Sequence, residues 1–463
     1  MSFSLTSKVD AANPYPVEDQ AFLDEWDGQY TWHPFAQTSE MKHFPPLRIT
    51  GGNGCWLHDA DGNRYLDGYA STWTNVHGHG VPELRRAIID QLDQIAHSTY
   101  LGLSHEPGTL LAKRLVDASP ADLQRVFFSD NGSTSVEVAL KMSLRYWQLK
   151  GKSERTTIVA MEGAYHGDTL GTMSLGADSP FTAPWRKWAF PVRRFKAPEC
   201  HELAGETFIS DDSESIEHLD RILGEENGGT AAVILEPSVQ GAAGMLQQPT
   251  GFLRKVKDLC LRHGAHLILD EVFVAFGRLG SILVCEAQQI CPDFLCLAKG
   301  LTGGYLPLAA TLATEEVFDA FTAPFHEHKT FYHGHTYTAN PLAASVSLKS
   351  FDLLQDKIRT SALDATIGSF GSKVRDTFCD HPRISEVRQR GLAACLDLCP
   401  GKDAAFDPQR RFALEVCKEA RARGLLLRPL GNSLPLVPPI AIDEKEISFL
   451  CSTALNAIEA VPL

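Results

Sequence analysis

The chain has 463 residues, of which 44% are hydrophobic and 22% charged, and this composition is ordinary for a soluble globular protein. A chain of this length can bury a large core and is expected to form two or three structural units. The formal net charge of −14 argues against a surface that binds nucleic acid or an anionic membrane.

The first residues and the cysteines indicate a cytoplasmic protein. The N-terminus has no charged segment followed by an apolar core, and no stretch approaches a membrane-spanning length of apolar residues. The 11 cysteines include no C-x-x-C pair, and several lie inside apolar runs, where thiols behave as small hydrophobic groups. We therefore expect reduced cysteines, no disulfide framework and no zinc site.

The N-terminal part of the chain predicts an irregular segment followed by a hairpin. Prolines and aromatic residues are interspersed over residues 14–48 and predict a surface segment without regular structure. Residues 54–57 and 64–66 predict two short strands joined by the turn residues 59–63. The stretch 67–80 contains two histidines, but it offers no ligand spacing that favours a metal site.

A strand–loop–helix pattern follows a predicted helix at Val81 to about Ile95. Residues 126–128 predict a strand, residues 129–135 a loop of small residues, and residues 136–147 a helix. Free N–H groups at such a helix start can bind a phosphate, and Gly132 allows a close approach. An ordinary helix capped by Ser or Thr explains the same pattern equally well.

Four further apolar runs end abruptly in polar or glycine residues. These runs are residues 156–161, 231–235, 267–269 and 294–298. Continuous apolar runs of this length are typical of strands covered on both faces, and helical patterns lie between several of them. The repetition predicts a doubly wound α/β domain with its site at the carboxyl ends of the strands. Residues 177–230 carry few periodic signals except a helix near 213–224.

Two of these runs end in Asp270 and Lys299, which should meet at one edge of the sheet. Such a pair can hold a pyridine ring at both ends, because the acid keeps the ring nitrogen protonated and the amine forms an imine with the aldehyde. A buried ion pair is the alternative on these residues alone. Tyr165 and Asp168 follow the run 156–161 and suit stacking on a flat cofactor, although a core tyrosine is equally compatible with them.

The remainder of the chain predicts a smaller α+β domain. A strand at 309–314 and a polar turn at 333–341 precede a long helix at 342–354, after which helices alternate with short strands. The strands near 54–66 are expected to join this domain. The predicted divisions are an N-terminal segment contributing to the small domain (1–75), a large domain (76–345) and a C-terminal small domain (346–463).

Together these features resemble the class III aminotransferases of fold type I, which depend on pyridoxal 5′-phosphate. The resemblance runs from Trp32-His33-Pro34-Phe35 to Arg428-Pro429-Leu430. Its most specific parts are residues 129–133, 165–169 and 239–245, with the Asp270 and Lys299 pair. It implies a large, mostly parallel doubly wound domain plus a smaller α+β domain.

The resemblance also implies roles for single residues. Lys299, Asp270 and Tyr165 are expected to be catalytic. The expected cofactor-binding residues are Gly132, Ser133, Tyr165, Asp270, Val272, Gln240, Lys299 and Thr336. In the family the last of these reaches the phosphate of the neighbouring subunit, which implies a homodimer. The expected substrate-binding residues are Arg428, Asp168, Trp73, Phe35, Gly334 and His335, with the arginine on the substrate carboxylate.

Within the family, the chain is most similar to members that convert 8-amino-7-oxononanoate to 7,8-diaminononanoate in biotin synthesis by a ping-pong mechanism. Phe35, Thr72-Trp73 and His335 depart from members that use S-adenosylmethionine as donor, which carry Tyr, a Trp pair and Pro there. Residues 303–307 and 333–337 are more similar to members that use L-lysine. Both donors therefore stay open. The segment 273–280 also departs from the family pattern.

Two other functions are compatible with part of the pattern. An ω-amino acid:pyruvate or glutamate-dependent aminotransferase has the same fold, but glutamate-using members carry Glu where Ala242 stands. A pyridoxal phosphate-binding protein without turnover is the other alternative. The presence of Lys299, Asp270, Tyr165 and Arg428 together argues against it.

Overall fold

The structure is a computed structural model that describes residues 20–42, 44–203, 207–400, 406–407 and 410–463. The chain divides into two compact units. The described part of the first comprises residues 20–42, 44–51 and 57–64, and the second comprises residues 52–56 and the described residues from Tyr65 onward. None of the described helices has both the length and the apolar character that a membrane crossing requires.

The first unit contains two helices where the sequence predicted irregular structure. These are α1 (Gln20–Tyr30) and α2 (Thr38–Met41), so the prediction is wrong for these residues, while residues 14–19 and 43 lie outside the described part. Phe22 and Trp26 stack at 5.9 Å between ring centroids within α1. This i,i+4 pair is the helical signal that the prolines and aromatic residues around it obscured.

The predicted hairpin near residues 54–66 is confirmed with shifted bounds. It consists of β2 (Trp56–Asp59) and β3 (Arg64–Asp67), and β1 (Ile49–Asn53) precedes it. The Asp59 carboxylate accepts the amides of Asp61 and Asn63 and so closes the turn.

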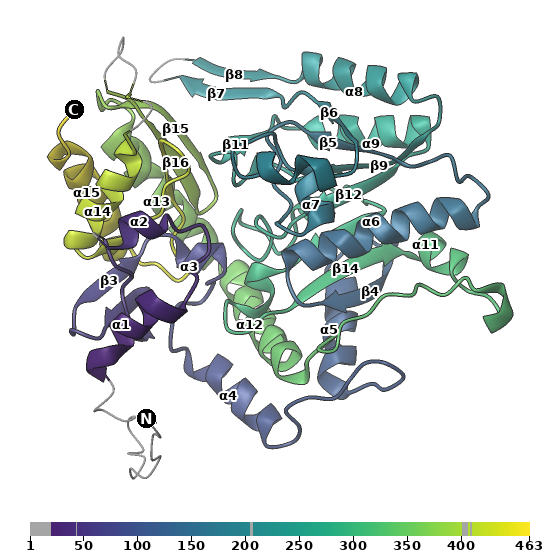
Figure 1. Ribbon diagram of the computed structural model, residues 1–463, viewed down its shortest axis with the longest axis horizontal. Coiled ribbons are helices and arrows are strands. Elements are labelled where there is room, and N and C mark those ends of the chain that lie inside the picture. Colours follow the sequence, from purple (N-terminus) through teal and green to yellow (C-terminus); the bar gives the residue numbers. More distant parts are fainter. Residues whose placement is uncertain (1–19, 43, 204–206, 401–405, 408–409) are drawn as a thin grey trace. The chain divides into compact units, whose positions relative to one another are not determined.

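The second unit is built on a seven-stranded sheet with the order β4-β14-β13-β12-β9-β5-β6 (Figure 1). The strands, in that order, are Leu123–Ser129, Ala309–Thr314, Phe294–Leu297, His266–Asp270, Thr230–Leu235, Thr157–Met161 and Val192–Phe195. Neighbours from β13 to β6 are parallel, and β14 runs antiparallel to both of its neighbours. The mostly parallel α/β sheet predicted from the apolar runs is therefore confirmed, with β6 as a strand that the sequence did not predict.

Successive residues of the central strands pack into two different hydrophobic clusters. Ile268 and Phe294 pack with α6, whereas Leu269 and Leu295 pack with α8 and α9. The helices of this part are α4 (Pro82–Leu92), α5 (Glu106–Asp117), α6 (Gly132–Leu149), α7 (Leu170–Leu175), α8 (Ser213–Glu225), α9 (Phe252–His263), α10 (Val284–Ala287), α11 (Glu315–Ala320) and α12 (Pro341–Arg359). Because both faces of the sheet are covered, the strands are continuous apolar runs.

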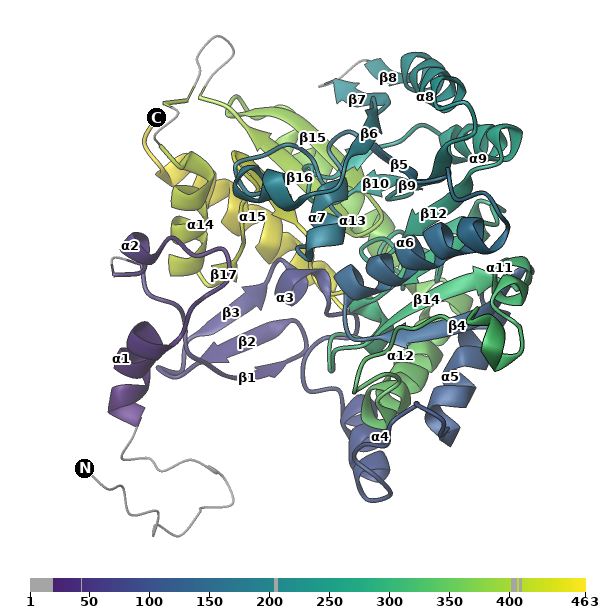
Figure 2. The ribbon, with the colours of Figure 1, turned by 45° about the vertical axis from the view of Figure 1, so that its right-hand side comes forward.

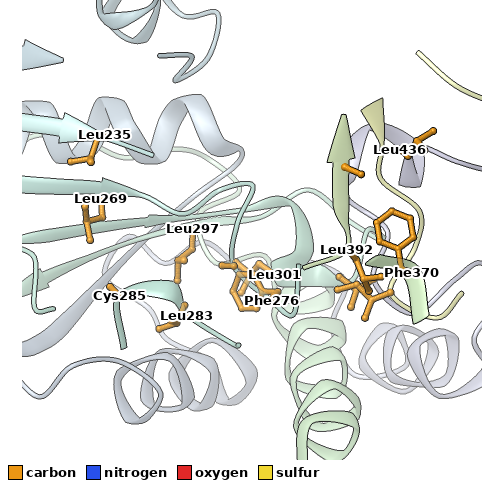
Figure 3. Packing of buried hydrophobic residues seen from close by; sticks show 14 of the residues in the cluster. Leu235, Leu269, Phe276, Leu283, Cys285, Leu297, Leu301, Phe370, Leu392 and Leu436 are labelled. Atoms are coloured by element: carbon orange, nitrogen blue, oxygen red, sulfur yellow. The ribbon is translucent and has the colours of Figure 1, made fainter. Parts of the chain in front are cut away.

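The last hundred residues form a second, three-stranded sheet with its own helices (Figure 2). Its strands are β15 (Ile384–Arg390), β16 (Ala393–Leu398) and β18 (Ser433–Leu436), and its helices are α13 (Ala362–Phe378), α14 (Phe412–Ala422) and α15 (Glu444–Ala460). The short strand β17 (Leu425–Leu426) pairs in parallel with β3. The hydrophobic cluster around Leu269, Leu301 and Leu392 runs from the large sheet into this region (Figure 3).

Four short strands and four further helical segments complete the described elements, and two of these segments are η2 (Ala183–Trp188) and η4 (Phe325–Glu327). The pairs are β7 (Glu199–Leu203) with β8 (Thr207–Asp211) and β10 (Val239–Gln240) with β11 (Leu246–Gln247). The turn α3 (Ala70–Trp73) and the 3-10 segment η3 (Lys299–Thr302) both contribute residues to the site described next. The predicted domain boundaries at residues 75 and 345 stay predictions.

Candidate active site

The two residues that ended the apolar runs lie at one edge of the large sheet. Asp270, the last residue of β12, is in register with Cys296 of the parallel strand β13, and Lys299 follows three residues later. Lys299 has a φ of 47°, a left-handed conformation that is rare for a residue with a side chain. Its amine lies 4.9 Å from the ring centroid of Trp73 and 5.7 Å from that of Phe273.

The Lys299 amine is held in an environment that favours its neutral form. Burial lowers the pKa of Lys299 below its usual value, and the charges of Asp270 and Glu236 oppose this shift only in part. The cation of Arg278 adds to the lowering. An amine that loses its proton readily can act as a nucleophile and as a proton carrier.

Asp270 is paired with a histidine to which the sequence argument gave no role. His166 Nδ1 lies 2.7 Å from Asp270 Oδ2, and Asp270 Oδ1 accepts the amide of Val272 at 3.0 Å. Burial works against a charged imidazole, but the hydrogen bond and charge of Asp270 outweigh it and raise the pKa of His166. His166 stands in the motif 165–169, so its position there was the signal that could have identified it.

Glu236 is a second residue that sequence reasoning missed. It follows β9 and is almost completely buried, and its carboxylate accepts the amides of Tyr165 at 3.3 Å and Gly241 at 3.0 Å. Burial raises the pKa of Glu236 to about 7, against the opposing charge of His166. Glu236 thereby joins the loop that carries Tyr165 to the loop that carries Gln240. The side-chain nitrogen of Gln240 donates to the Glu162 carbonyl at 2.9 Å.

The start of α6 forms a closely packed backbone cradle. Asn131 caps the helix by accepting the amide of Thr134 at 3.0 Å, which leaves the first two amides, of Gly132 and Ser133, without an intrahelical partner. A Cβ on Gly132 would lie 2.7 Å from a methyl group of Val272, so no side chain fits there. The predicted phosphate-binding residues are thus brought against the end of β12.

Tyr165 and Asp168 are also brought to this edge. The Tyr165 hydroxyl donates to Asp168 at 2.9 Å, and the Asp168 amide donates to Ser133 Oγ at 3.3 Å. Between them Gly167 has a φ of 125°, and a Cβ there would lie 2.0 Å from Ser133 Oγ. Burial and the neighbouring Asp168 raise the pKa of Tyr165, so the phenol stays neutral.

The aromatic wall beside Lys299 is formed by Trp73 and Phe273, whose ring centroids lie 4.7 Å apart. Trp73 ends α3, in which Ala70, Ser71, Thr72 and Trp73 all have positive φ values, between 47° and 68°. Each non-glycine residue with this left-handed conformation costs about 1–2 kcal/mol of conformational free energy. Phe273 belongs to the segment 273–280 that departs from the family pattern, and here its ring covers Gly241.

The remaining predicted residues lie at different places. Gly334 and Thr336 are exposed, and His335 Nδ1 lies 2.7 Å from Asp130 Oδ2, beside the α6 cradle. Arg428 is exposed two residues beyond β17, and its charge acts on Tyr69. Phe35 belongs to the first unit and is 59% exposed, and its expected role stays a prediction.

These residues fit pyridoxal 5′-phosphate. A readily deprotonated amine, a carboxylate paired with a buried histidine, and a glycine-bearing helix start lie around one edge of the sheet. The buried Nε2 of His166 has no hydrogen-bond partner among the residues that the structure describes. In the described part of the chain, no group of three or more His, Cys, Asp or Glu residues is placed to hold a metal ion.

Comparison with known proteins gives consistent matches over nearly the whole chain. The family model "Aminotransferase class-III" matches residues 36–458. The chain is 42% identical to the adenosylmethionine-8-amino-7-oxononanoate aminotransferase of Geobacter sulfurreducens, over 96% of this chain and 99% of that one. It is 39% identical to the protein of the same name from Aquifex aeolicus, over 95% and 98% of the two chains.

Solved structures give the same result. The crystal structure of the Methanocaldococcus jannaschii protein of that name superposes with a TM-score of 0.90 and 36% identity, covering 96% of this chain and 100% of that one. A PLP-bound amine transaminase from an uncultivated Pseudomonas species superposes with a TM-score of 0.84 and 31% identity, covering 93% and 98%. The cofactor of this fold and site is pyridoxal 5′-phosphate, and the chain belongs to the class III aminotransferases.

Proposed function

We propose that this aminotransferase transfers an amino group to 8-amino-7-oxononanoate and forms 7,8-diaminononanoate, with S-adenosylmethionine or L-lysine as donor. The names of relatives at 42% and 39% identity over nearly the full chain support the acceptor. The observation that carries the chemistry is the Lys299 amine, whose pKa is lowered and which lies at the same sheet edge as the Asp270–His166 pair.

Lys299 and Asp270 have different tasks in this proposal. Lys299 holds the cofactor when no substrate is bound, and its freed neutral amine then moves a proton at the substrate carbon. Asp270 faces the ring nitrogen and stays oriented by His166 and by the amide of Val272. Bound pyridoxal phosphate supplies an electron sink for the carbanion formed at that carbon. Release of the first product before the second substrate binds gives ping-pong kinetics.

The other cofactor contacts follow from the cradle and the ring pocket. The backbone amides of Gly132 and Ser133 would bind the phosphate at the start of α6. Tyr165 and Val272 would hold the ring of bound pyridoxal phosphate by packing against it, and the side chain of Gln240 would contact its phenolic oxygen. Thr336 reaches the phosphate of a second subunit, which requires a homodimer.

Substrate contacts are assigned on the same basis. Arg428 binds the carboxylate of the acceptor, because a guanidinium matches a carboxylate with two parallel hydrogen bonds. Asp168 lines the same pocket, Trp73 forms its wall beside Lys299, and Gly334 and His335 complete it. We place the enzyme in the cytoplasm.

The test is a coupled assay of the purified protein with 8-amino-7-oxononanoate and each donor in turn, with the product identified by mass spectrometry. We expect 7,8-diaminononanoate with at least one donor, and none from a Lys299→Ala variant. Product with a single donor identifies that donor. Turnover of an ω-amino acid with pyruvate, without any product from 8-amino-7-oxononanoate, would contradict the proposed acceptor.

A further inference from the structure

We propose that Asp67 is a positioning residue that fixes the left-handed turn α3 and thereby sets Trp73 as the wall of the amino-donor site above Lys299. Asp67 ends β3 and is completely buried, although it touches neither Lys299 nor Trp73 in the hydrogen bonds of the site. This inference rests on the proposed function, because it concerns the donor that the site accepts.

The turn needs an external restraint. Four consecutive residues, Ala70 to Trp73, adopt left-handed φ values, and none of them is glycine. Left-handed backbone is unfavourable for each of them, so the turn persists only where its surroundings impose it. Within the turn, the amide of Trp73 donates to the Tyr69 carbonyl at 2.9 Å and that of Thr74 to the Ala70 carbonyl at 2.9 Å.

The Asp67 carboxylate supplies the restraint with both of its oxygens. Oδ1 accepts the amide of Ser71 at 2.9 Å, and Oδ2 accepts the Ser71 hydroxyl at 2.8 Å. Oδ2 lies also 3.0 Å from Nε2 of His79. A carboxylate accepts at all of these positions at once, whereas an amide in its place would have only one accepting oxygen.

The neighbours of His79 determine which nitrogen carries its proton. The side-chain oxygen of Asn75 accepts the amide of Gly78 at 2.7 Å, so the side-chain nitrogen of Asn75 faces His79 Nδ1 at 3.2 Å. That nitrogen can only donate, so Nδ1 accepts and Nε2 holds the hydrogen that it donates to Asp67. The chain of hydrogen bonds therefore runs in one direction into the Asp67 carboxylate.

The same segment also holds the region of the expected carboxylate-binding arginine. Gly68 donates to the Leu426 carbonyl at 3.0 Å and accepts the amide of Val437 at 2.9 Å. A Cβ on Gly68 would lie 2.8 Å from the Leu426 carbonyl oxygen, so this approach requires glycine. Asp67 thus lies between the strand that leads to Arg428 and the turn that ends in Trp73.

Trp73 covers Lys299, whereas Arg428 lies two residues beyond β17. Loosening the turn should therefore affect the Trp73 side of the site more than the Arg428 side. The indole is a flat surface against which the donor chain must fit. Its position depends on the turn that Asp67 restrains. We therefore expect Asp67 to influence the donor half-reaction more than the acceptor half-reaction.

The test uses the purified holoenzyme and compares Asp67→Asn with Asp59→Asn. Asp59 is a matched control because it is also a buried aspartate whose carboxylate closes a turn. Hydrogen exchange of peptides that cover residues 68–76 is measured first. We expect faster exchange in Asp67→Asn and unchanged exchange of these peptides in Asp59→Asn.

The two half-reactions are then measured separately by stopped-flow absorbance of the cofactor. For Asp67→Asn we expect the KM for the donor to rise about tenfold, because one or two hydrogen bonds to a charged group are lost. The KM for the acceptor should change by less than about threefold. Unchanged exchange over residues 68–76, or equal slowing of both half-reactions, would overturn the proposal.

A Ser71→Ala variant provides the same test if Asp67→Asn does not fold. It removes only the contact of the hydroxyl with Asp67 and should raise the KM for the donor by a smaller factor. An unchanged KM for the donor together with unchanged hydrogen exchange would overturn the proposal. If the wild-type enzyme transaminates neither donor, the proposed function fails. The exchange measurement then still decides whether Asp67 restrains the turn.

Discussion

The two sides of the active site are built in different ways. Asp270 ends β12 and Lys299 lies two residues beyond the neighbouring strand β13, so their proximity follows from the register of the two strands. Trp73, on the other side, is held by a left-handed turn and by the distant residue Phe273. The comparison shows that regular structure positions the catalytic residues Asp270 and Lys299. Strained backbone and a contact with a distant residue position Trp73, which faces the donor.

The largest effect is expected on the side of the strand ends. Asp270→Asn keeps the shape of the side chain but removes the charge that orients His166 and faces the ring nitrogen. We expect kcat to fall about 10³-fold, which is the size of the rate loss when an acid–base residue is removed. The pKa of His166 should fall as well, because Asp270 raises it, and NMR titration of the imidazole measures this shift. A variant with near wild-type kcat would contradict the assigned role of Asp270.

A second prediction concerns Glu236 and pH. Its pKa rises from 4.5 in the unfolded chain to about 7 in the folded protein, so the folded state binds the proton more tightly. Between these values the unfolded state loses its proton first, and the stability of the wild-type protein falls as pH rises from about 4.5 to 7. Glu236→Gln removes this dependence.

The stability of Glu236→Gln relative to the wild type should therefore increase by up to about 3 kcal/mol between pH 4.5 and pH 7.5. The thermal midpoints of both proteins across this pH range measure it. The change with pH is the informative quantity, because the lost amide contact of Tyr165 or Gly241 lowers stability at every pH. A constant difference across the range would contradict the raised pKa.

A smaller effect is expected at the phosphate cradle. Gly132→Ala places a Cβ 2.7 Å from a methyl group of Val272, which must move and widen the cradle. We expect the affinity for pyridoxal phosphate to fall about tenfold, because one or two hydrogen bonds to the phosphate anion are lost. Gly224→Ala is the control, because nothing lies within 4 Å of its Cβ position. Equal affinities of the two variants would show that the cradle tolerates a side chain.

The smallest effect tests the strained side of the site. Thr72 has a φ of 65° and is exposed, so Thr72→Gly relieves an unfavourable conformation. The relief is partly offset by the greater freedom of glycine in the unfolded chain, and we expect a gain of up to about 1 kcal/mol in the free energy of unfolding. Thr74→Gly, where φ is −93°, should destabilise the protein instead. Denaturant unfolding of both variants compares them directly.

The sequence predicted the parts of the molecule that depend on local patterns. The buried strands β9, β12 and β13 are uninterrupted apolar runs, and the polar residues at their ends, Asp270 and Lys299, were identified with them. The strand β6 was missed because Val192-Arg193-Arg194-Phe195 has only two apolar residues, and its arginines pair with residues elsewhere in the chain.

The missed parts of the site depend on contacts between distant residues. His166 stands in the motif 165–169 and Glu236 directly follows the apolar run 231–235, but their roles come from Asp270 and from the backbone amides of Tyr165 and Gly241. The left-handed turn at Ala70 to Trp73 has no glycine, so its residue types do not predict its conformation. It forms because a buried carboxylate three residues earlier in the chain accepts its hydrogen bonds.

The most direct test of the central claim is the site at which the cofactor is attached. Purified holoenzyme is reduced with borohydride, digested and examined by mass spectrometry. We expect a single pyridoxyl adduct on the peptide that contains Lys299, and loss of that adduct in Lys299→Ala. An adduct on another lysine, or none in a protein that is yellow with bound cofactor, would contradict the assignment of this amine and of the sheet edge as the catalytic centre.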